Sequence, residues 1–420
     1  MVSLCISAVA STQGKTLLTS ALLYRFKESV RPFKIGPDFI DPQFHRAICG
    51  TDSINLDAFM MNPEQLRWLY GRYADREVAI MEGVMGFYDG MDYGSSAYDV
   101  STLLNVPTVI VLDAQGSYIT PSAVLGGLKA YRADNTIRGV ILNRLGSQSH
   151  YELIKNRIES DFDDVAVLGW VRDGLDALRD THLGLDLRDC DKLAAISTQA
   201  LEHIDIDALI ALGRSDAPAA KGYPFPPPPR SEDAVAVVCD ENFSFLYPDN
   251  LRFLEEAFSS VCLVSPSCDE PIPDTCKSVY ICGGYVETDA AYETLRNARC
   301  FKDSLIRHAR SGKIYAECAG LLYLGQRVDD KEMSGILDVS FTLEKRFQRM
   351  GYYTNEAGIK GHAFHYTRPL DTEGGFDILR GAKTGTGQAG SWTNAEGNVL
   401  GTYLHTLFRS HPDLVRRRLM

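Results

Sequence analysis

The chain has 420 residues and a formal net charge of −12 at pH 7, and at roughly 150 residues per domain this length predicts two or three domains with cores of their own. The negative charge excludes a general affinity for nucleic acid, because phosphate backbones are bound through clustered Lys and Arg. The sequence holds no apolar run long enough to span a bilayer, so no membrane role is expected.

The chain begins with MVSLCISAVA, which is apolar but carries no basic leader. Because this stretch runs directly into a Gly-Lys-Thr loop, it is predicted to be a buried strand and not a signal peptide. We therefore expect a cytoplasmic protein. The ten cysteines form no C-x-x-C pair and show no zinc-ligand spacing, which agrees with scattered reduced thiols.

In the first half of the chain, short apolar runs alternate with longer amphipathic stretches. Strands separated by segments of helical length indicate a parallel sheet that is covered on both faces. The predicted strands are Val2–Ala10, Val78–Glu82, Thr108–Asp113, Gly139–Asn143 and Val165–Trp170.

Residues 213–233 lose the hydrophobic periodicity and contain a run of prolines, which favours extended structure. We place a linker there, between a first domain at residues 1–212 and a second at 234–420. The second half restarts the α/β pattern without an evident internal repeat. Its predicted strands are Ala234–Cys239, Val261–Val264, Ser278–Cys282, Lys313–Glu317 and Asn398–Leu404.

The segment Ser11–Thr16 lies between a predicted strand and an amphipathic helix, where a phosphate-binding loop belongs. Gly14 would allow the turn, Lys15 would reach the terminal phosphates, and the Thr16 hydroxyl would bind Mg²⁺. The first glycine of the strict motif is missing, since Val9 stands five residues before Gly14. Taken alone, the short Gly-Lys-Thr string also fits an ordinary helix start.

Acidic residues follow where a metal–nucleotide site needs them, because hard carboxylate oxygens suit Mg²⁺. We expect Thr16, Asp41 and Glu82 to bind the metal. Asp38, Asp41 and Asp89 are expected near the substrate or the transferred phosphoryl group. Asp38 and Asp41 also stand beside prolines, so turn formation is the alternative interpretation of that pair.

A second constellation begins at Cys318, which follows an apolar strand and precedes a small-residue turn and a helical segment. This strand–elbow–helix pattern exposes a nucleophile. His405 ends a later strand and is the candidate base that favours the thiolate. Gly284 and Ala319 are the predicted oxyanion-hole donors through their backbone N–H groups.

Structural interpretations remain open for these residues. A lone cysteine among ten is often an inert buried residue, and this applies to Cys318. His362 and His365 are as compatible with packed histidines as with substrate contacts.

Many short motifs in order resemble those of the cobyrinate a,c-diamide synthases and the related nickel-sirohydrochlorin a,c-diamide synthases over nearly the full chain. The strings that carry the resemblance are KIGPDFIDPQFH, EGVMGFYDG, GVILNRLGSQSH, Leu183-Gly184-Leu185 after His182, FSFLYPDNL, ICGGYVE, YAECAGLLYL, GHAFHY and GTYLHTLF. The resemblance implies an α/β fold with a P-loop, dethiobiotin-synthetase-like domain that phosphorylates a carboxylate. It also implies a triad-type, class I-like glutamine amidotransferase domain that releases ammonia.

The sequence departs from the family pattern at Ala319, where glycine is frequent, and at Val286, where proline is usual. In glutaminases with a full triad an acid stands two residues after the histidine, and here that position is Leu407. The prediction is therefore a Cys318–His405 pair whose orienting group is not identified.

The resulting functional prediction is ATP-dependent amidation of the a- and c-side-chain carboxylates of cobyrinate, with Mg²⁺ as cofactor and ATP and L-glutamine as further small-molecule partners. Nickel-sirohydrochlorin is the alternative substrate. A partitioning-type ATPase switch and a catalytically inactive tetrapyrrole-binding protein are alternatives from other classes. Analogy with relatives of the first domain also makes a homodimer an expected assembly.

Overall fold

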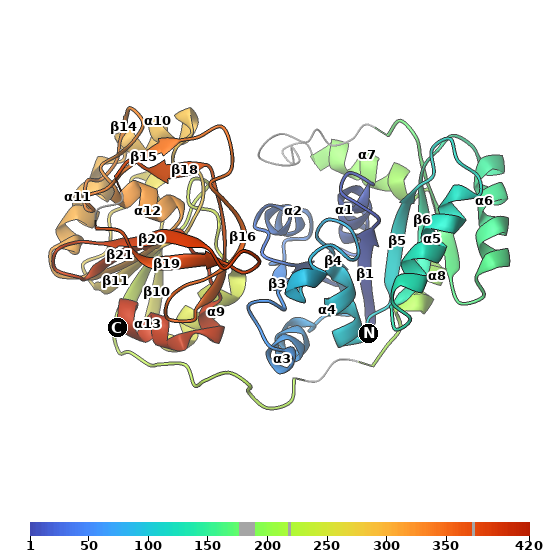
Figure 1. Cartoon of the computed structure of the whole chain (residues 1–420), viewed down its shortest axis with the longest axis horizontal. Helices are drawn as coiled ribbons and strands as arrows, with labels where there is room; N and C mark the ends of the chain where they lie inside the picture. The colour runs from blue at the N-terminus through green and yellow to red at the C-terminus, as the bar shows by residue number, and fades with distance from the viewer. Residues whose placement is uncertain (176–189, 217–219, 372–373) are drawn as a thin grey trace. The chain divides into compact units, whose positions relative to one another are not determined.

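The computed structural model describes residues 1–175, 190–216, 220–371 and 374–420. The chain forms two compact units, Met1–Pro224 and Phe225–Met420, which are described separately (Figure 1). The division falls within the proline-rich stretch 213–233. The motif at Leu183-Gly184-Leu185 lies outside the described residues.

The first unit is built on an eight-stranded sheet in the order β3-β2-β4-β1-β5-β6-β7-β8. All neighbouring strands are parallel except β7 and β8. The strands are β1 Val2–Ala8, β2 Val30–Ile35, β3 Ile54–Leu56, β4 Val78–Glu82, β5 Thr108–Asp113, β6 Ile137–Leu145, β7 Ala166–Arg172 and β8 His203–Ile204. The helices are α1 Lys15–Arg25, α2 Ile40–Cys49, α3 Pro63–Tyr73, α4 Ala97–Leu104, α5 Thr120–Tyr131, α6 Gln148–Asp161, α7 Cys190–Leu201 and α8 Ile206–Gly213, with the short 3₁₀ turn η1 at Met91–Tyr93.

The central strands of this sheet are apolar because helices cover both faces. Nearly every residue of β1 and β4 is buried, and Leu4, Ile6 and Ile80 are fully enclosed in the core. This confirms the predicted parallel-sheet α/β domain. The strands β2 and β3 escaped prediction, because β2 carries Arg31 and Lys34 among its apolar residues.

The second unit contains a nine-stranded sheet in the order β10-β9-β11-β12-β21-β20-β19-β16-β17. The first five strands are parallel, and the pairings from β21 to β17 are antiparallel. These strands are β9 Ala234–Val238, β10 Ser260–Val264, β11 Cys276–Ile281, β12 Lys313–Glu317, β16 Arg349–Thr354, β17 Lys360–His365, β19 Phe376–Gly381, β20 Gly387–Thr393 and β21 Val399–Thr402. A four-stranded sheet adds β13 Arg327–Val328, β14 Lys331–Glu332, β15 Ser340–Leu343 and β18 Thr367–Pro369.

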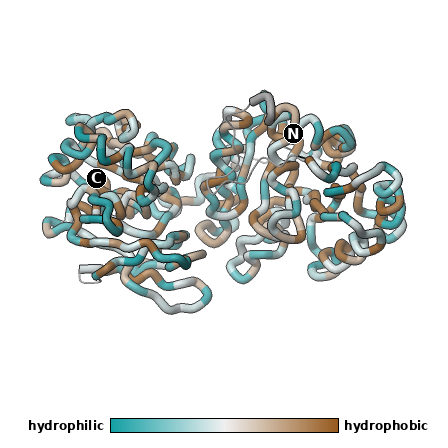
Figure 2. Tube along the Cα trace, turned by 90° about the horizontal axis from the view of Figure 1, so that it is seen from above, coloured by the Kyte–Doolittle hydropathy of each residue, from teal (hydrophilic) through white to brown (hydrophobic). Residues whose placement is uncertain are grey.

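Helices pack against the parallel half of this second sheet, as expected for an α/β domain. They are α9 Pro248–Ala257, α10 Asp289–Asn297, α11 Arg299–Ala309, α12 Ala319–Leu324 and α13 Pro412–Leu419, with 3₁₀ turns η2 Pro266–Cys268 and η3 Phe408–Ser410. Figure 2 shows hydrophobic and hydrophilic stretches alternating along each unit, as strands buried beneath amphipathic helices require. Within the described ranges, no helix combines the length and apolar character needed to cross a bilayer.

Candidate active sites

The loop between β1 and α1 approaches β6 closely. Gly14 takes a left-handed conformation, with φ of 94°, at the start of α1. A Cβ at Gly14 would lie 2.2 Å from Asn143 Nδ2, which donates a hydrogen bond to the Gln13 carbonyl over 2.8 Å. Glycine is therefore required at position 14 both by the backbone angle and by the space available.

A cluster of charged side chains lies beside this loop. Thr16 Oγ1 donates a hydrogen bond to Glu82 Oε1 over 2.8 Å. Lys34 is 1% exposed, and its ammonium group pairs with Asp41 and lies 3.5 Å from Asp38 Oδ2 and 3.7 Å from Glu82 Oε1. Four residues singled out from the sequence therefore meet at one place, around a lysine that was not predicted.

Electrostatics in this cluster follow from burial and pairing. Burial alone would raise the pKa of Glu82, but the charge of Lys34 and the hydrogen bond from His45 hold it well below its usual range. Burial and the charge of Glu82 raise the pKa of Asp41 to about 6, against the opposing effect of Lys34. Burial lowers the pKa of Lys15, which a neighbouring Glu82 partly restores.

His45 fixes the second carboxylate oxygen of Glu82. Its Nε2 lies 2.8 Å from Glu82 Oε2, and its Nδ1 lies 2.9 Å from Ser53 Oγ. Glu82 is thus held at both oxygens, by Thr16 and by His45. A carboxylate fixed in this way is pre-oriented for a ligand.

Asp89 lies next to the loop between β1 and α1. Its Oδ2 accepts a hydrogen bond from the Gly86 N–H over 2.8 Å. A Cβ at Gly86 would stand 2.3 Å from the Val9 carbonyl oxygen, so the turn packs directly on the loop. One oxygen of Asp89 is therefore committed to the turn.

The donor set around Thr16 fits Mg²⁺ in its chemistry. A hydroxyl and the carboxylates of Glu82 and Asp41 are hard oxygen ligands, and a magnesium ion needs only a few of them beside water and phosphate oxygens. Among the residues that the structure describes, no group of three or more His, Cys, Asp or Glu side chains is already arranged as a metal cage.

In the second unit, Cys318 stands between β12 and α12. Its backbone has φ of 48° and ψ of −105°, which is strained for a residue with a side chain. The Cys318 N–H donates to the Thr402 carbonyl over 2.7 Å. The strand–elbow–helix arrangement predicted from the sequence is therefore present.

His405 is brought to Cys318 by strand order. Cys318 follows β12 and His405 follows β21, and these strands are parallel neighbours with Glu317 opposite Thr402. His362 of β17 and His405 exchange two antiparallel backbone hydrogen bonds, of 2.8 and 2.9 Å, which fix the backbone of His405. His362, the first histidine of the GHAFHY motif, therefore contributes its backbone to the site.

The His405 ring lies between the nucleophile and an acid. His405 Nδ1 is 3.4 Å from Glu317 Oε2, and both residues are at most 2% exposed. Burial would lower the pKa of His405, but hydrogen bonds to Cys318 and Glu317, with the charges of these groups, raise it to about 9. The imidazole is thus stabilised as a cation, the form that supports a thiolate.

The glycine pair after β11 borders this site. A Cβ at Gly283 would lie 2.3 Å from His405 Cε1, so the ring rests against the bare backbone. A Cβ at Gly284 would lie 2.0 Å from the Asn242 carbonyl oxygen, which excludes any side chain there. Ala319 is the first residue of α12, and its backbone N–H is one of those that the first helical turn leaves unbonded within the helix.

His365 has a structural environment. Its ring stacks on Tyr403 at 3.7 Å between centroids, and its Nδ1 lies 2.9 Å from the Thr367 carbonyl. Burial and the nearby Arg349 lower the pKa of His365 to about 3. This residue is a packed neutral histidine, which was one of the two interpretations of the sequence.

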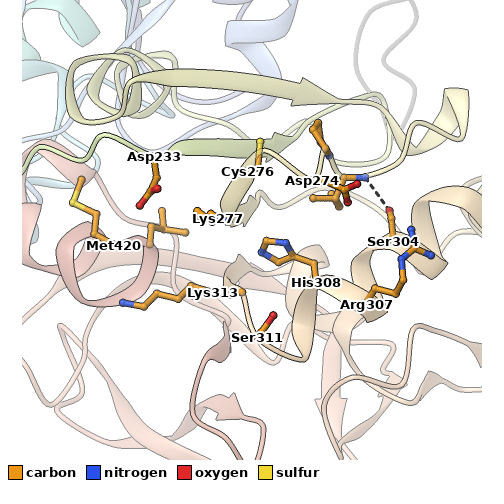
Figure 3. Close-up of a pocket in the computed structure, with 14 residues that line it drawn as sticks. Asp233, Asp274, Cys276, Lys277, Ser304, Arg307, His308, Ser311, Lys313 and Met420 are labelled. Carbon is orange, nitrogen blue, oxygen red and sulfur yellow. Dashed lines mark hydrogen bonds between the residues drawn. The ribbon is translucent and has the colours of Figure 1, made fainter.

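A separate cavity of about 550 Å³ lies in the second unit (Figure 3). Cys276 and Lys313, the first residues of β11 and β12, line it, together with His308 of α11. Since Cys318 follows the opposite end of β12, this cavity is not the thiol site. Both basic and acidic side chains line it, among them Lys277 and Asp274 (Figure 3).

Comparison with known proteins decides the family. The model of the CobB/CobQ-like glutamine amidotransferase domain matches residues 234–413. The chain is 32% identical to a cobyrinate a,c-diamide synthase from Salmonella typhimurium, covering 99% of this chain and 96% of that protein. The chain belongs to the cobyrinate a,c-diamide synthase family.

Other members of this family show similar agreement. A cobyrinate a,c-diamide synthase from Caldanaerobacter subterraneus is 33% identical, covering 99% of this chain and 97% of that protein. A hydrogenobyrinate a,c-diamide synthase from Mesorhizobium japonicum is 33% identical, covering 97% of this chain and 99% of that protein. The chain is accordingly an enzyme, a glutamine-hydrolysing carbon–nitrogen ligase.

Four residues of these sites were missed in the sequence. Lys34 and His45 lie within the quoted KIGPDFIDPQFH string, Asn143 within GVILNRLGSQSH, and Glu317 directly before Cys318. A lysine inside an apolar strand was the available signal for Lys34. The other three become recognisable only when strand order places them beside Glu82, Gly14 and His405.

Proposed function

We propose that the enzyme converts the a- and c-side-chain carboxylates of a cobyrinate-type tetrapyrrole to amides, using ATP and glutamine-derived ammonia in the cytoplasm. The observation that carries the proposal is the pairing of two sites in one chain. One is the Thr16–Glu82–Lys34 cluster beside a phosphate loop, and the other is the Cys318–His405 elbow. The names of full-length relatives supply the substrate.

In the first unit, the enzyme would activate a carboxylate, which is otherwise a poor electrophile. The carboxylate oxygen attacks the γ-phosphorus of ATP, ADP leaves, and an acyl phosphate forms. Lys15 and the loop N–H groups would stabilise charge on the transferring group. Thr16, Asp41 and Glu82 would hold Mg²⁺, which when bound neutralises phosphate charge.

Lys34 would keep this acidic site assembled before the nucleotide arrives. Three carboxylates without a cation would repel each other strongly in a buried place. With Lys34 between them, Asp38 and Asp41 can face the substrate while Glu82 stays ionised. Asp89 would orient the turn that closes on the loop.

In the second unit, the Cys318 thiolate would attack the side-chain amide carbon of glutamine. His405 takes the thiol proton and delivers it to the departing ammonia, which leaves a thioester. Water then hydrolyses the thioester, so that glutamate and the thiol are released. Backbone N–H groups of Gly284 and Ala319 would stabilise the tetrahedral oxyanion.

Ammonia then attacks the acyl phosphate, phosphate leaves, and the amide forms. A second round at another carboxylate gives the diamide. A partitioning-type ATPase switch would have no use for the strained Cys318 or the buried cationic His405, so these residues favour the synthase.

The test uses the full chain with Mg-ATP, glutamine and either cobyrinate or nickel-sirohydrochlorin, and mass spectrometry counts the amides formed. We expect a diamide from cobyrinate. The Cys318→Ala variant should lose synthesis from glutamine and keep it with ammonium chloride. Diamide from the nickel compound alone would change the substrate, whereas ATP hydrolysis without any amide would overturn the synthase proposal.

A further inference from the structure

Glu317 occupies an unusual place for a buried acid. It is the last residue of β12, directly before the nucleophile, and is 1% exposed. Its Oε2 faces His405 Nδ1 at 3.4 Å. A buried carboxylate is costly unless charge or hydrogen bonds compensate it.

Two tyrosines provide that compensation from inside the sheet. Tyr280 Oη donates to Glu317 Oε2 over 3.0 Å, and Tyr315 Oη lies 3.2 Å from Glu317 Oε1. Both tyrosines are buried, and burial together with the charge of Glu317 raises their pKa well above the usual value. They therefore remain protonated donors, and the carboxylate has a fixed position.

We infer that Glu317 is the positioning residue that orients His405 for reaction with Cys318. This inference rests on the proposed glutaminase function of the second unit. Glu317 binds the Nδ1 side of the ring, which leaves Nε2 as the nitrogen for the thiol. It takes the role that an acid after the histidine has in other glutaminases, where this chain has the buried apolar Leu407.

His405 carries the protons that move during turnover, and Glu317 stays beside its ring. The thiol proton moves to His405 Nε2, and the ring then carries its second proton on Nδ1, facing Glu317. The same Nε2 proton leaves with ammonia as the thioester forms, and a proton from water restores the cation during hydrolysis. Glu317 takes no part in these proton transfers and stabilises the imidazolium through its contact with Nδ1, as the acid of a serine-protease triad does.

Strand geometry explains how Glu317 reaches His405. A residue before the nucleophile points away from the elbow, because side chains alternate across a strand. Glu317 can reach His405 because the neighbouring strand β21 ends opposite it, with Glu317 paired to Thr402. The acid therefore comes from the strand of the nucleophile and not from the strand of the histidine.

The test substitutes Glu317→Gln, which preserves volume and removes the charge. Glu270→Gln is the matched control, since Glu270 accepts a hydrogen bond from the Ser265 N–H at the end of the edge strand β10. We expect Glu317→Gln to lower glutamine hydrolysis by about 100-fold or more. Ammonia-dependent amidation should stay at the wild-type rate in both variants.

A second measurement separates positioning from a structural role. The alkylation rate of Cys318 by iodoacetamide is followed against pH by peptide mass spectrometry, with exposed Cys268 as internal reference. The groups that act on His405 are Cys318, Glu317 and, more weakly, the neutral His365. Removing the Glu317 charge should move the midpoint of Cys318 alkylation upward by about one pH unit or more.

Several outcomes overturn the inference. Wild-type glutamine hydrolysis in Glu317→Gln with an unchanged alkylation profile removes the positioning role. If Glu317→Gln does not fold, Glu317→Asp decides, because it keeps the charge but withdraws the carboxylate by one methylene. Wild-type hydrolysis in that variant also removes the role. If the wild-type enzyme itself hydrolyses no glutamine, the proposed function fails, which is a distinct result.

Discussion

Thr16 and Glu82 are 66 residues apart in the chain, yet Thr16 Oγ1 donates a hydrogen bond to Glu82 Oε1 over 2.8 Å. The contact arises because α1 begins after β1, and β4 is the strand directly beside β1, with Ile6 opposite Glu82. The phosphate loop and the buried acid are therefore coupled through adjacent strands. The contact provides the first test of the proposed ATP site.

Thr16→Val should abolish this coupling without changing side-chain volume appreciably. We expect ammonia-dependent amide synthesis to fall by about 100-fold, because both the hydroxyl ligand and the partner of Glu82 are lost. Thr16→Ser keeps the hydroxyl and should retain most of the activity. Glutamine hydrolysis in the second unit should be unaffected, and equal activity of the valine and serine variants would contradict the role.

The Asp41→Asn variant tests whether ionisation of the buried Asp41 carboxylate lowers the free energy of unfolding. The pKa of Asp41 is raised from 3.8 to about 6, so the folded state favours the protonated form of Asp41. The stability that this residue contributes is fully present below pH 3.8 and is lost as the pH rises through 6. The asparagine variant, which cannot ionise, should therefore gain stability relative to wild type between pH 4 and 7, by up to about 3 kcal/mol. Urea unfolding of both proteins at these pH values measures the difference.

The same variant should lose ammonia-dependent amidation, because the metal and phosphoryl site loses a carboxylate. A stability difference that stays constant or decreases with pH would contradict the raised pKa. Wild-type activity in the variant would remove Asp41 from the site while leaving the stability result intact.

Strands were predictable where their buried residues are also mostly apolar. The strands β1, β4 and β5 are mostly apolar, with polar residues that are small or stand at a strand end, and their positions follow from composition. The strand β2 was not predicted because Arg31 and Lys34 interrupt its apolar residues. Both side chains form ion pairs that no local sequence pattern reveals. The antiparallel strands β16 to β20 are partly exposed, so their apolar signal is weak.

The sequence singles out site residues that carry their own local signal, such as a turn or a strand end. Gly14, Lys15 and Cys318 stand in recognisable strand–loop–helix contexts. Glu317 carries no such signal, because its function depends on the order of β12 and β21 in the sheet. A sequence without strand order therefore indicates a Cys–His pair and leaves its orienting acid unassigned.

Gly283→Ala should inactivate the glutaminase by crowding alone. The added Cβ would lie 2.3 Å from His405 Cε1, so the ring must move. A displacement of about 1 Å at a reacting group costs roughly 100-fold in rate, and we expect that loss in glutamine hydrolysis. Gly127→Ala in α5 meets nothing within 4 Å and serves as the control.

Ammonia-dependent synthesis should be normal in both glycine variants, since Gly283 lies in the second unit and a Cβ at Gly127 meets nothing within 4 Å. A Gly283→Ala enzyme that hydrolyses glutamine at the wild-type rate would show that His405 does not act from this position. Equal losses with glutamine and with ammonia would instead indicate a general folding defect.

Asn143→Ala tests how much the phosphate loop depends on β6. Asn143 Nδ2 holds the Gln13 carbonyl at 2.8 Å and stands where a side chain at Gly14 would clash. Losing this hydrogen bond should free the loop to sample conformations that do not cradle phosphate. We expect the KM for ATP to rise about 10-fold, equivalent to about 1.4 kcal/mol, with kcat changed less. Asn143→Asp keeps the shape but places an acceptor against the carbonyl, so it should be worse than alanine. If alanine and aspartate leave the KM unchanged, the loop is held by its own backbone and Asn143 only fills space.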